Sequence, residues 1–137
     1  MVKQVLKDLE AVAPGDLIAV EWFDASIGKS SASGAAIDVP VQSWGIYVGL
    51  IGKRVKHIVI AQNSFRYSNG FFDLDYTAIP LSWALGVSVL VKGHIPSDVA
   101  TRIVNSFLAG GHRALRHPRT LKSRVFQMRL SEDGRPN

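Results

Sequence analysis

Residues 41–62, VQSWGIYVGLIGKRVKHIVIAQ, carry the strongest structural signal in the chain. Two runs rich in β-branched and aromatic residues, 41–50 and 55–62, flank the segment Ile51-Gly52-Lys53-Arg54. Such runs are typical of β-strands, and a short connection that contains glycine is typical of a hairpin. The stretch therefore predicts two antiparallel strands and places a sheet at the centre of the fold.

Further strands are predicted on both sides of this hairpin. The turn Pro14-Gly15-Asp16 precedes a largely apolar run at 17–23, and Asn69-Gly70 precedes an alternating run at 71–76. A fifth run rich in valine occupies 87–92. Because proline and glycine at such positions mark the ends of strands, we expect about five strands.

Helices are predicted at both ends of this series. Four apolar residues follow the i, i+3, i+4, i+7 spacing of one helix face, namely Val2, Val5, Leu6 and Leu9. That helix must end before Pro14. A second helix is predicted to begin after Pro96 with Ser97 as its N-cap, and to end at Gly110-Gly111.

This order of elements predicts an α+β fold, with a small and strongly bent antiparallel sheet or a barrel-like sheet of about five to six strands between an N-terminal and a C-terminal helix. Residues 121–130 hold five large apolar side chains in ten positions and are the candidate for the additional strand. The 137 residues, 47% of them apolar, suit one domain. We expect that domain to span 1–130, followed by a flexible tail at 131–137.

The charge of the chain is concentrated near its C-terminal end. Residues 1–111 contain nine basic and nine acidic side chains, whereas residues 112–137 contain seven basic and two acidic ones, so this last segment holds the whole net charge of +5. A basic segment beside a neutral body indicates the kind of partner rather than the fold.

The preferred prediction is that this basic segment binds DNA or RNA. Arginine matches phosphate geometry with two hydrogen bonds, and each phosphate contact releases counterions. The candidate nucleic-acid-binding residues are Arg113, Arg116, Arg119, Lys122, Arg124 and Arg129. The alternative is assembly, as a homo-oligomer or virion component, because Val125, Phe126, Met128 and Leu130 are interleaved with these charges.

A third and less favoured interpretation is a hydrolase-like fold. The run Trp44-Gly-Ile-Tyr-Val-Gly49, with Pro14-Gly15-Asp16 before it, resembles the sheet of papain-like NlpC-type hydrolases and of the related lecithin–retinol acyltransferase group. That resemblance implies a histidine near Ser43 and a cysteine nucleophile, but the chain contains no cysteine. A serine activated by His57 would have to replace them, so we expect no catalytic residues and no enzyme.

Other patterns predict no cofactor and no metal site. Gly28-Lys29-Ser30 lacks the earlier glycine and the following helix of a phosphate-binding loop. The histidines form no close pair on one helix face. Asp73 and Asp75 share one face of a predicted strand; the alternation favours a solvent-facing surface there, with a cation as the other possibility.

The longest nearly uncharged stretch, 76–91, has 16 residues and is interrupted by Pro80 and Gly86. A membrane span needs about 20 apolar residues, so we expect no membrane contact and a cytoplasmic location. Taken whole, segments 14–25, 44–63 and 73–80 resemble an uncharacterised small protein of a spherical virus that infects Pyrobaculum, with relatives in hyperthermophilic crenarchaea. The resemblance implies a thermophilic archaeal host cell and plausible DNA or capsid partners, but no site residues.

Overall fold

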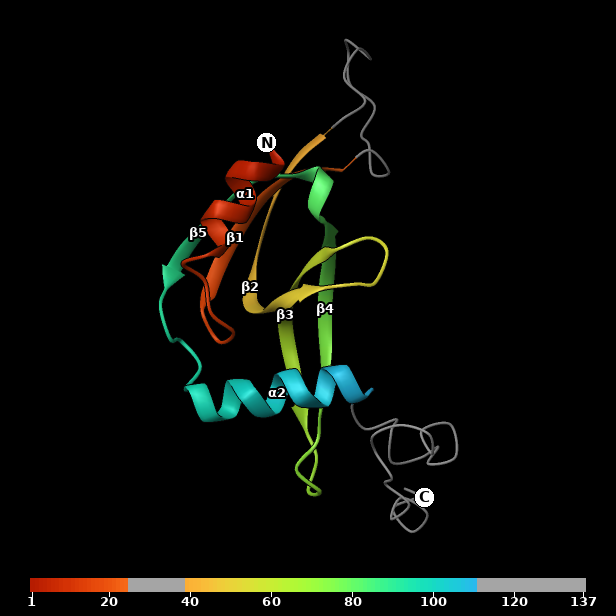
Figure 1. Ribbon diagram of the computed structural model, residues 1–137. Helices are drawn as coiled ribbons and strands as arrows, with labels where there is room; N and C mark the ends of the chain where they lie inside the picture. Colours follow the sequence, from red (N-terminus) through yellow and green to blue (C-terminus); the bar gives the residue numbers. More distant parts are fainter. Residues whose placement is uncertain (25–38, 111–137) are drawn as a thin grey trace.

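The computed structural model describes residues 1–24 and 39–110. The elements in this part of the chain are α1 (Val2–Leu9), β1 (Leu17–Asp24), β2 (Val39–Ile51), β3 (His57–Arg66), β4 (Phe72–Pro80), the 3₁₀ helix η1 (Leu81–Trp83), β5 (Ala84–Val91) and α2 (Ser97–Ala109). The predicted α+β class is confirmed, with one five-stranded antiparallel sheet and a helix at each end of the series (Figure 1). The predicted strand at 121–130, the tail at 131–137 and the Gly28-Lys29-Ser30 motif lie outside the described residues.

The sheet has the strand order β4-β3-β2-β1-β5, and every neighbouring pair is antiparallel. The predicted hairpin forms its centre. β2 and β3 pair from Ile51 with His57, next to the turn, to Ile46 with Ala61. Gly52 begins the connection with a φ of 139°. A side chain at this position would overlap the carbonyl oxygen of Val55, so the turn requires glycine.

The sheet is strongly bent without being closed. β4 and β5 are its opposite edges, yet only the three residues of η1 join them. Such a short connection requires the two edges to approach each other where η1 lies. Register shifts in β2 between Tyr47 and Gly49, and in β3 between Ala61 and Asn63, mark the irregularities that increase this bending.

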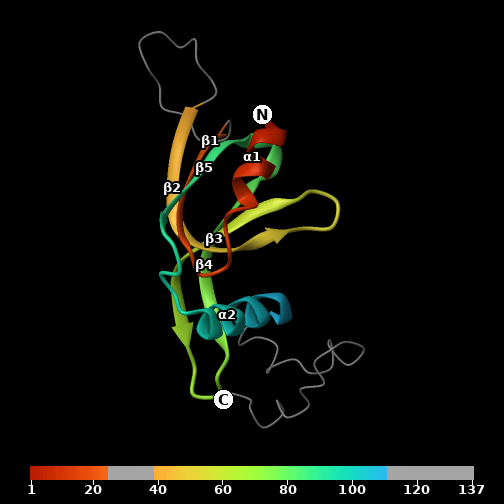
Figure 2. The same cartoon turned by 60° about the vertical axis from the view of Figure 1, so that its left-hand side comes forward.

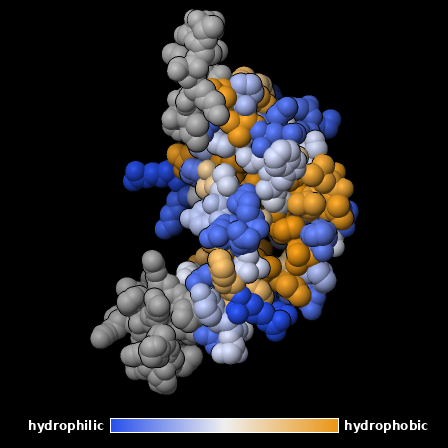
Figure 3. Space-filling view, turned by 180° about the vertical axis from the view of Figure 1, so that it is seen from behind, coloured by the Kyte–Doolittle hydropathy of each residue, from blue (hydrophilic) through white to orange (hydrophobic). Residues whose placement is uncertain are grey.

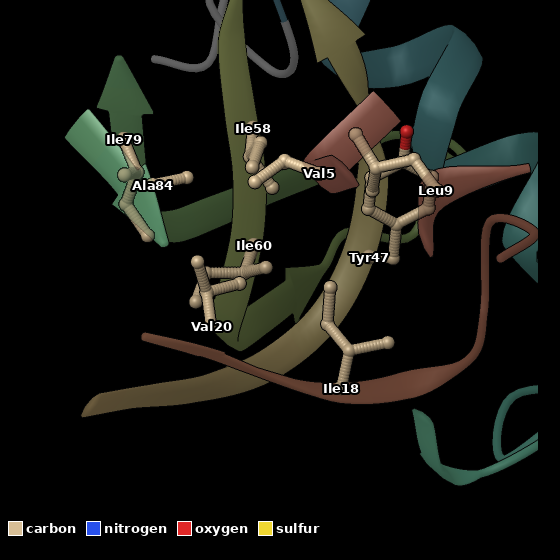
Figure 4. Packing of buried hydrophobic residues seen from close by; sticks show 9 residues of the cluster. All are labelled: Val5, Leu9, Ile18, Val20, Tyr47, Ile58, Ile60, Ile79 and Ala84. Atoms are coloured by element: carbon tan, nitrogen blue, oxygen red, sulfur yellow. The ribbon is translucent and has the colours of Figure 1, made fainter. Parts of the chain in front are cut away.

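The larger core lies between α1 and the sheet. Nine buried residues from α1 and all five strands pack together there, namely Val5, Leu9, Ile18, Val20, Tyr47, Ile58, Ile60, Ile79 and Ala84 (Figure 4). Tyr47 is the largest of them, and burial raises the pKa of its phenol. Of the four residues predicted to form the apolar helix face, Val5 and Leu9 close this core, whereas Val2 and Leu6 are exposed.

A smaller core lies on the other face of the sheet, beneath α2. Val59 and Ala61 belong to it, together with Val48, whereas Ile58 and Ile60 belong to the larger core. Neighbouring residues of β3 therefore alternate between two covered faces. A strand buried on both faces has a nearly unbroken apolar sequence, which explains the pattern of this segment.

α2 is anchored on β4 as well. The rings of Tyr76 and Phe107 meet edge to face with centroids 5.0 Å apart. The hydroxyl oxygen of the buried Ser106 accepts a hydrogen bond of 3.3 Å from the backbone N–H of Phe72. The edge strand β4 is therefore covered on one face by the last two turns of α2.

The start of α2 corrects one prediction. Pro96, not Ser97, occupies the N-cap position, and no side chain caps the helix there. Pro96 has the extended backbone (φ −56°, ψ 145°) that an N-cap requires, so Ser97 is already the first helical residue. The other end is as predicted, because Gly110 adopts a left-handed conformation with φ of 93°.

All five strands are longer than predicted, by two residues or more in every strand except β1. β4 continues to Pro80 instead of ending at Tyr76, and β5 begins at Ala84 instead of Val87. Pro80 is tolerated because β4 is an edge strand, where one N–H is not needed for pairing. The predicted break between these strands is confined to η1.

Candidate functional site

The structure fixes where the predicted nucleic-acid-binding segment begins. Arg113, Arg116, Arg119, Lys122, Arg124 and Arg129 all lie outside the described residues. They follow α2 directly, and α2 ends at Ala109 with Gly110 as its C-cap. The basic segment therefore starts from the C-terminal end of α2.

A second group of basic residues lies in the connection between β2 and β3. Lys53, Arg54 and Lys56 occupy three of four consecutive positions there, and all three are exposed. No carboxylate in the described part of the chain forms an ion pair with any of them. These residues, called the basic hairpin below, were not predicted as a site, although the sequence Lys-Arg-Val-Lys at a turn was the available signal.

The basic hairpin and the C-terminal end of α2 project towards the same side of the molecule. Figures 1 and 2 both show the hairpin in yellow and the last turn of α2 in blue on the right-hand side. The two elements are more than 40 residues apart in sequence, since β3 begins at His57 and Gly110 follows α2. The fold thus brings the end of α2, the last described element before the basic segment in sequence, to the side that carries the basic hairpin.

The opposite side of the molecule carries an apolar patch. On the edge strand β5, Val89, Leu90 and Val91 are 37%, 49% and 44% exposed. Figure 3, seen from behind, shows apolar side chains gathered along the right-hand edge, which is the side where β5 lies. These three residues are called the β5 patch below.

α1 covers part of the free edge of β5. The Asp8 side chain accepts a hydrogen bond of 3.3 Å from the backbone N–H of Val87. A side chain that occupies an edge N–H in this way prevents further strand pairing at that point. The edge is thus shielded at Val87 and carries its exposed apolar side chains further along, in the β5 patch.

Asp73 and Asp75 of β4 line a hollow beside the end of α2, to which Phe107 and Gly110 also contribute. The phenol of Tyr67 donates to Asp73 at 3.1 Å, and the amide of Asn63 donates to Asp75 at 3.2 Å. The described residues contain no group of three or more histidine, aspartate or glutamate side chains that could hold a metal ion. Asp75 is exposed and Asp73 is half-buried.

Ser43 and His57 are not brought together. The Ser43 hydroxyl oxygen accepts a hydrogen bond of 3.0 Å from the indole N–H of Trp22. His57 pairs with Ile51, eight positions after Ser43 on β2, which corresponds to about 26 Å along the strand. The Nδ1 of His57 instead donates to the carbonyl oxygen of Val55 at 3.0 Å. This arrangement supplies no serine–histidine pair.

No protein-family model, no curated protein and no solved structure matches this chain. The resemblances to NlpC-type hydrolases and to the Pyrobaculum virus protein therefore stay predictions. Neither helix in the described ranges, 1–24 and 39–110, is long and apolar enough to cross a lipid bilayer.

Proposed function

We propose that this protein is a non-catalytic nucleic-acid-binding protein that contacts DNA or RNA through residues 112–137 and the basic hairpin. The observation that supports the proposal is that the basic hairpin lies on the same side of the fold as the C-terminal end of α2, after which the basic segment follows in the chain (Figures 1 and 2). One polyanion can then meet both. The resemblance to a viral protein of a thermophilic archaeal host agrees with a cell interior in which such partners are present.

The chemistry of both elements suits phosphate. The segment 112–137 has five more basic than acidic side chains, and six of its seven basic residues are arginines. Lys53, Arg54 and Lys56 add exposed cations that no described carboxylate neutralises. A two-stranded ribbon also fits the major groove of duplex DNA, so the hairpin has a shape as well as a charge that suits a nucleic acid.

Binding isotherms over a series of salt concentrations test this proposal. Fluorescent duplex and single-stranded DNA and RNA are titrated with the wild type and with a variant in which Arg113, Arg116, Arg119 and Lys122 are replaced by glutamine. We expect affinity to fall as salt rises and to fall further in the variant, because phosphate contacts release counterions. An affinity that does not change with salt concentration, or an unchanged affinity in the variant, would refute the proposal.

A matched pair of double variants separates local contact from overall charge. Lys53→Gln with Arg54→Gln removes two charges from the basic hairpin. Lys3→Gln with Lys7→Gln removes two charges from the exposed face of α1, away from the hairpin (Figure 1). We expect the first pair to weaken binding and the second to have a small effect, whereas equal effects would contradict a role of the hairpin.

We propose self-assembly through the β5 patch as the second candidate function. β5 is an edge strand, and Val89, Leu90 and Val91 expose apolar surface there. Exposed apolar edge strands are pairing sites for other chains. Light scattering of the wild type and of Leu90→Lys tests this: we expect a dimer mass that falls to the monomer mass in the variant, and a wild-type monomer would exclude it.

A further inference from the structure

A groove with a volume of about 410 Å³ lies between the α2 face of the sheet and the start of α2. Its apolar lining comes from Ile46, Ala61, Leu74 and Ile103, on β2, β3, β4 and α2. Asn63, Ser64 and His94 also line it. The groove thus combines apolar surface with a few polar groups, as small-ligand sites do.

Trp44 lines this groove and is 55% exposed. An aromatic ring that is open to solvent beside a groove offers a face on which a planar ligand can stack. Val48, four residues further along the same strand, is only 1% exposed. The sequence around Trp44 therefore places an accessible indole where a buried side chain would be expected.

The backbone at Trp44 is held firmly. The Gln62 side-chain amide donates to the Trp44 carbonyl oxygen at 3.0 Å, and its own carbonyl oxygen accepts from the Thr77 hydroxyl at 3.3 Å. At the next residue, Gly45, a side chain would come within 2.9 Å of the Ala61 carbonyl oxygen. These contacts hold the backbone that carries the indole, so a ligand that stacks there orders little additional backbone.

The polar groups of the groove have unused hydrogen-bonding capacity. The side chains of Ser64 and His94 make no hydrogen bond within the described part of the chain. Asn63 uses its N–H for Asp75, which leaves its amide oxygen as an acceptor. Among the residues that the structure describes, no lysine, arginine, aspartate or glutamate lines the groove. A charged ligand would find no counter-charge here, and a purely aliphatic one would not use these groups.

We infer that this groove binds a neutral planar heteroaromatic ring, and that its ligand is an unpaired nucleobase. Such a ring stacks on the face of Trp44 while its edge exchanges hydrogen bonds with Asn63, Ser64 and His94. The choice of a nucleobase among heteroaromatic rings rests on the proposed nucleic-acid binding. The groove then adds a stacking contact to the electrostatic contacts of the basic residues.

The first test uses uncharged nucleosides, which have no phosphate for the basic residues to bind. Adenosine and thymidine are titrated to millimolar concentrations into the full chain, and the indole N–H signal of Trp44 is followed by NMR. We expect this signal and the backbone signals of Asn63 and Ser64 to shift, while those of Trp22 and Trp83, which stack on each other 6.2 Å apart, stay in place. No shift at Trp44 overturns the inference.

The second test compares two exposed aromatic residues. Trp44→Ala removes the stacking ring of the groove, and Phe65→Ala removes a ring of similar exposure, 49%, that does not line it. Loss of one stacked base lowers affinity roughly 5- to 150-fold. We expect Trp44→Ala to lower the affinity for single-stranded DNA by that factor and the affinity for duplex DNA much less. Phe65→Ala is expected to keep nearly the wild-type affinity for both.

The two proposals fail in different ways. If the wild type and Trp44→Ala bind single-stranded DNA with equal affinity, the inference that the groove binds a nucleobase is wrong, whereas the proposed nucleic-acid binding is unaffected. A wild type that binds no oligonucleotide overturns the proposed function, and the nucleoside titration then decides whether the groove takes the ring alone. Replacement of both Asn63 and Ser64 by alanine leaves Trp44 in place and is expected to weaken nucleoside binding; an unchanged affinity would contradict the assigned edge contacts.

Discussion

The carboxylate of Asp16 and the ammonium group of Lys92 lie 2.7 Å apart, although 76 residues separate them in the chain. The Asp16 side chain is 2% exposed and that of Lys92 is 61% exposed. Asp16 also accepts backbone hydrogen bonds from Ala13 at 2.9 Å and from Gly93 at 2.8 Å. One carboxylate therefore joins the turn before β1 to the turn after β5.

Acid is expected to weaken the fold through Asp16. Burial alone raises the pKa of this carboxyl, but the hydrogen bonds from Ala13, Lys92 and Gly93 outweigh it and hold the pKa below its usual 3.8. Its contribution is therefore complete above that value and is lost as pH falls through the lowered folded pKa. Urea unfolding at about pH 6 and about pH 3 should show a smaller drop in unfolding free energy for Asp16→Asn than for the wild type.

Asp16→Asn is expected to cost more stability than Lys92→Gln at neutral pH. The aspartate change weakens three charge-assisted hydrogen bonds at a buried site, and bonds of this kind contribute about 1.5–3 kcal/mol each. The lysine change removes a mostly exposed partner and leaves both backbone donors in place. Denaturant midpoints at pH 7 measure the difference, and a larger loss in the lysine variant would contradict this account.

Gly52→Ala is expected to destabilise the protein by about 2 kcal/mol or more, because the left-handed backbone and the overlap with the Val55 carbonyl both oppose a side chain. Gly70 is the matched control: its φ is 89°, but a side chain there meets no atom within 4 Å. We expect Gly70→Ala to cost only about 1 kcal/mol. Thermal unfolding of both variants tests whether the overlap adds to the backbone strain.

Ile60→Ala is expected to cost about 2–5 kcal/mol, because Ile60 has no exposed surface and contacts the core beneath α1. Val55→Ala, at a site 54% exposed, should change the unfolding free energy by less than about 0.5 kcal/mol. Equilibrium urea unfolding measures both changes. Similar costs at the two positions would mean that the core is not where the structure places it.

The salt dependence of DNA binding should report the hairpin contacts. If Lys53 and Arg54 each neutralise one phosphate, the double glutamine variant lowers the slope of log affinity against log salt by about 1.8 on duplex DNA. The matched variant at Lys3 and Lys7 should keep the wild-type slope. Isotherms at four or more salt concentrations distinguish these outcomes, and an unchanged hairpin slope would contradict direct phosphate contact.

Most helix and strand positions could be predicted from the sequence because their signals are local. The apolar spacing of Val5 and Leu9 and the glycine at position 52 depend on neighbours a few residues away. The Ser97 prediction was wrong for a related reason: serine is a favourable N-cap, but the extended backbone of Pro96 moved the cap one residue earlier. The identity of the nearby residues did not distinguish these two arrangements.

The candidate sites were less accessible to such reasoning. Trp44 looked like one more apolar strand residue, because its exposure depends on which parts of β3 and α2 stand beside it. The basic hairpin looked like an ordinary turn, because its relation to the end of α2 is visible only in three dimensions (Figure 1). Local pattern contains no information about which distant segments share a side of the molecule.

The sequence by itself therefore determined the α+β class, the hairpin at residues 51–57 and the uneven distribution of charge, since each of these follows from composition or from short-range alternation. Only the tertiary structure decided that the sheet edges approach across η1, that Asp16 meets Lys92, and that Trp44 stands exposed in a groove. Those features depend on contacts between residues far apart in the chain, and such contacts are selected by the packing of both cores together.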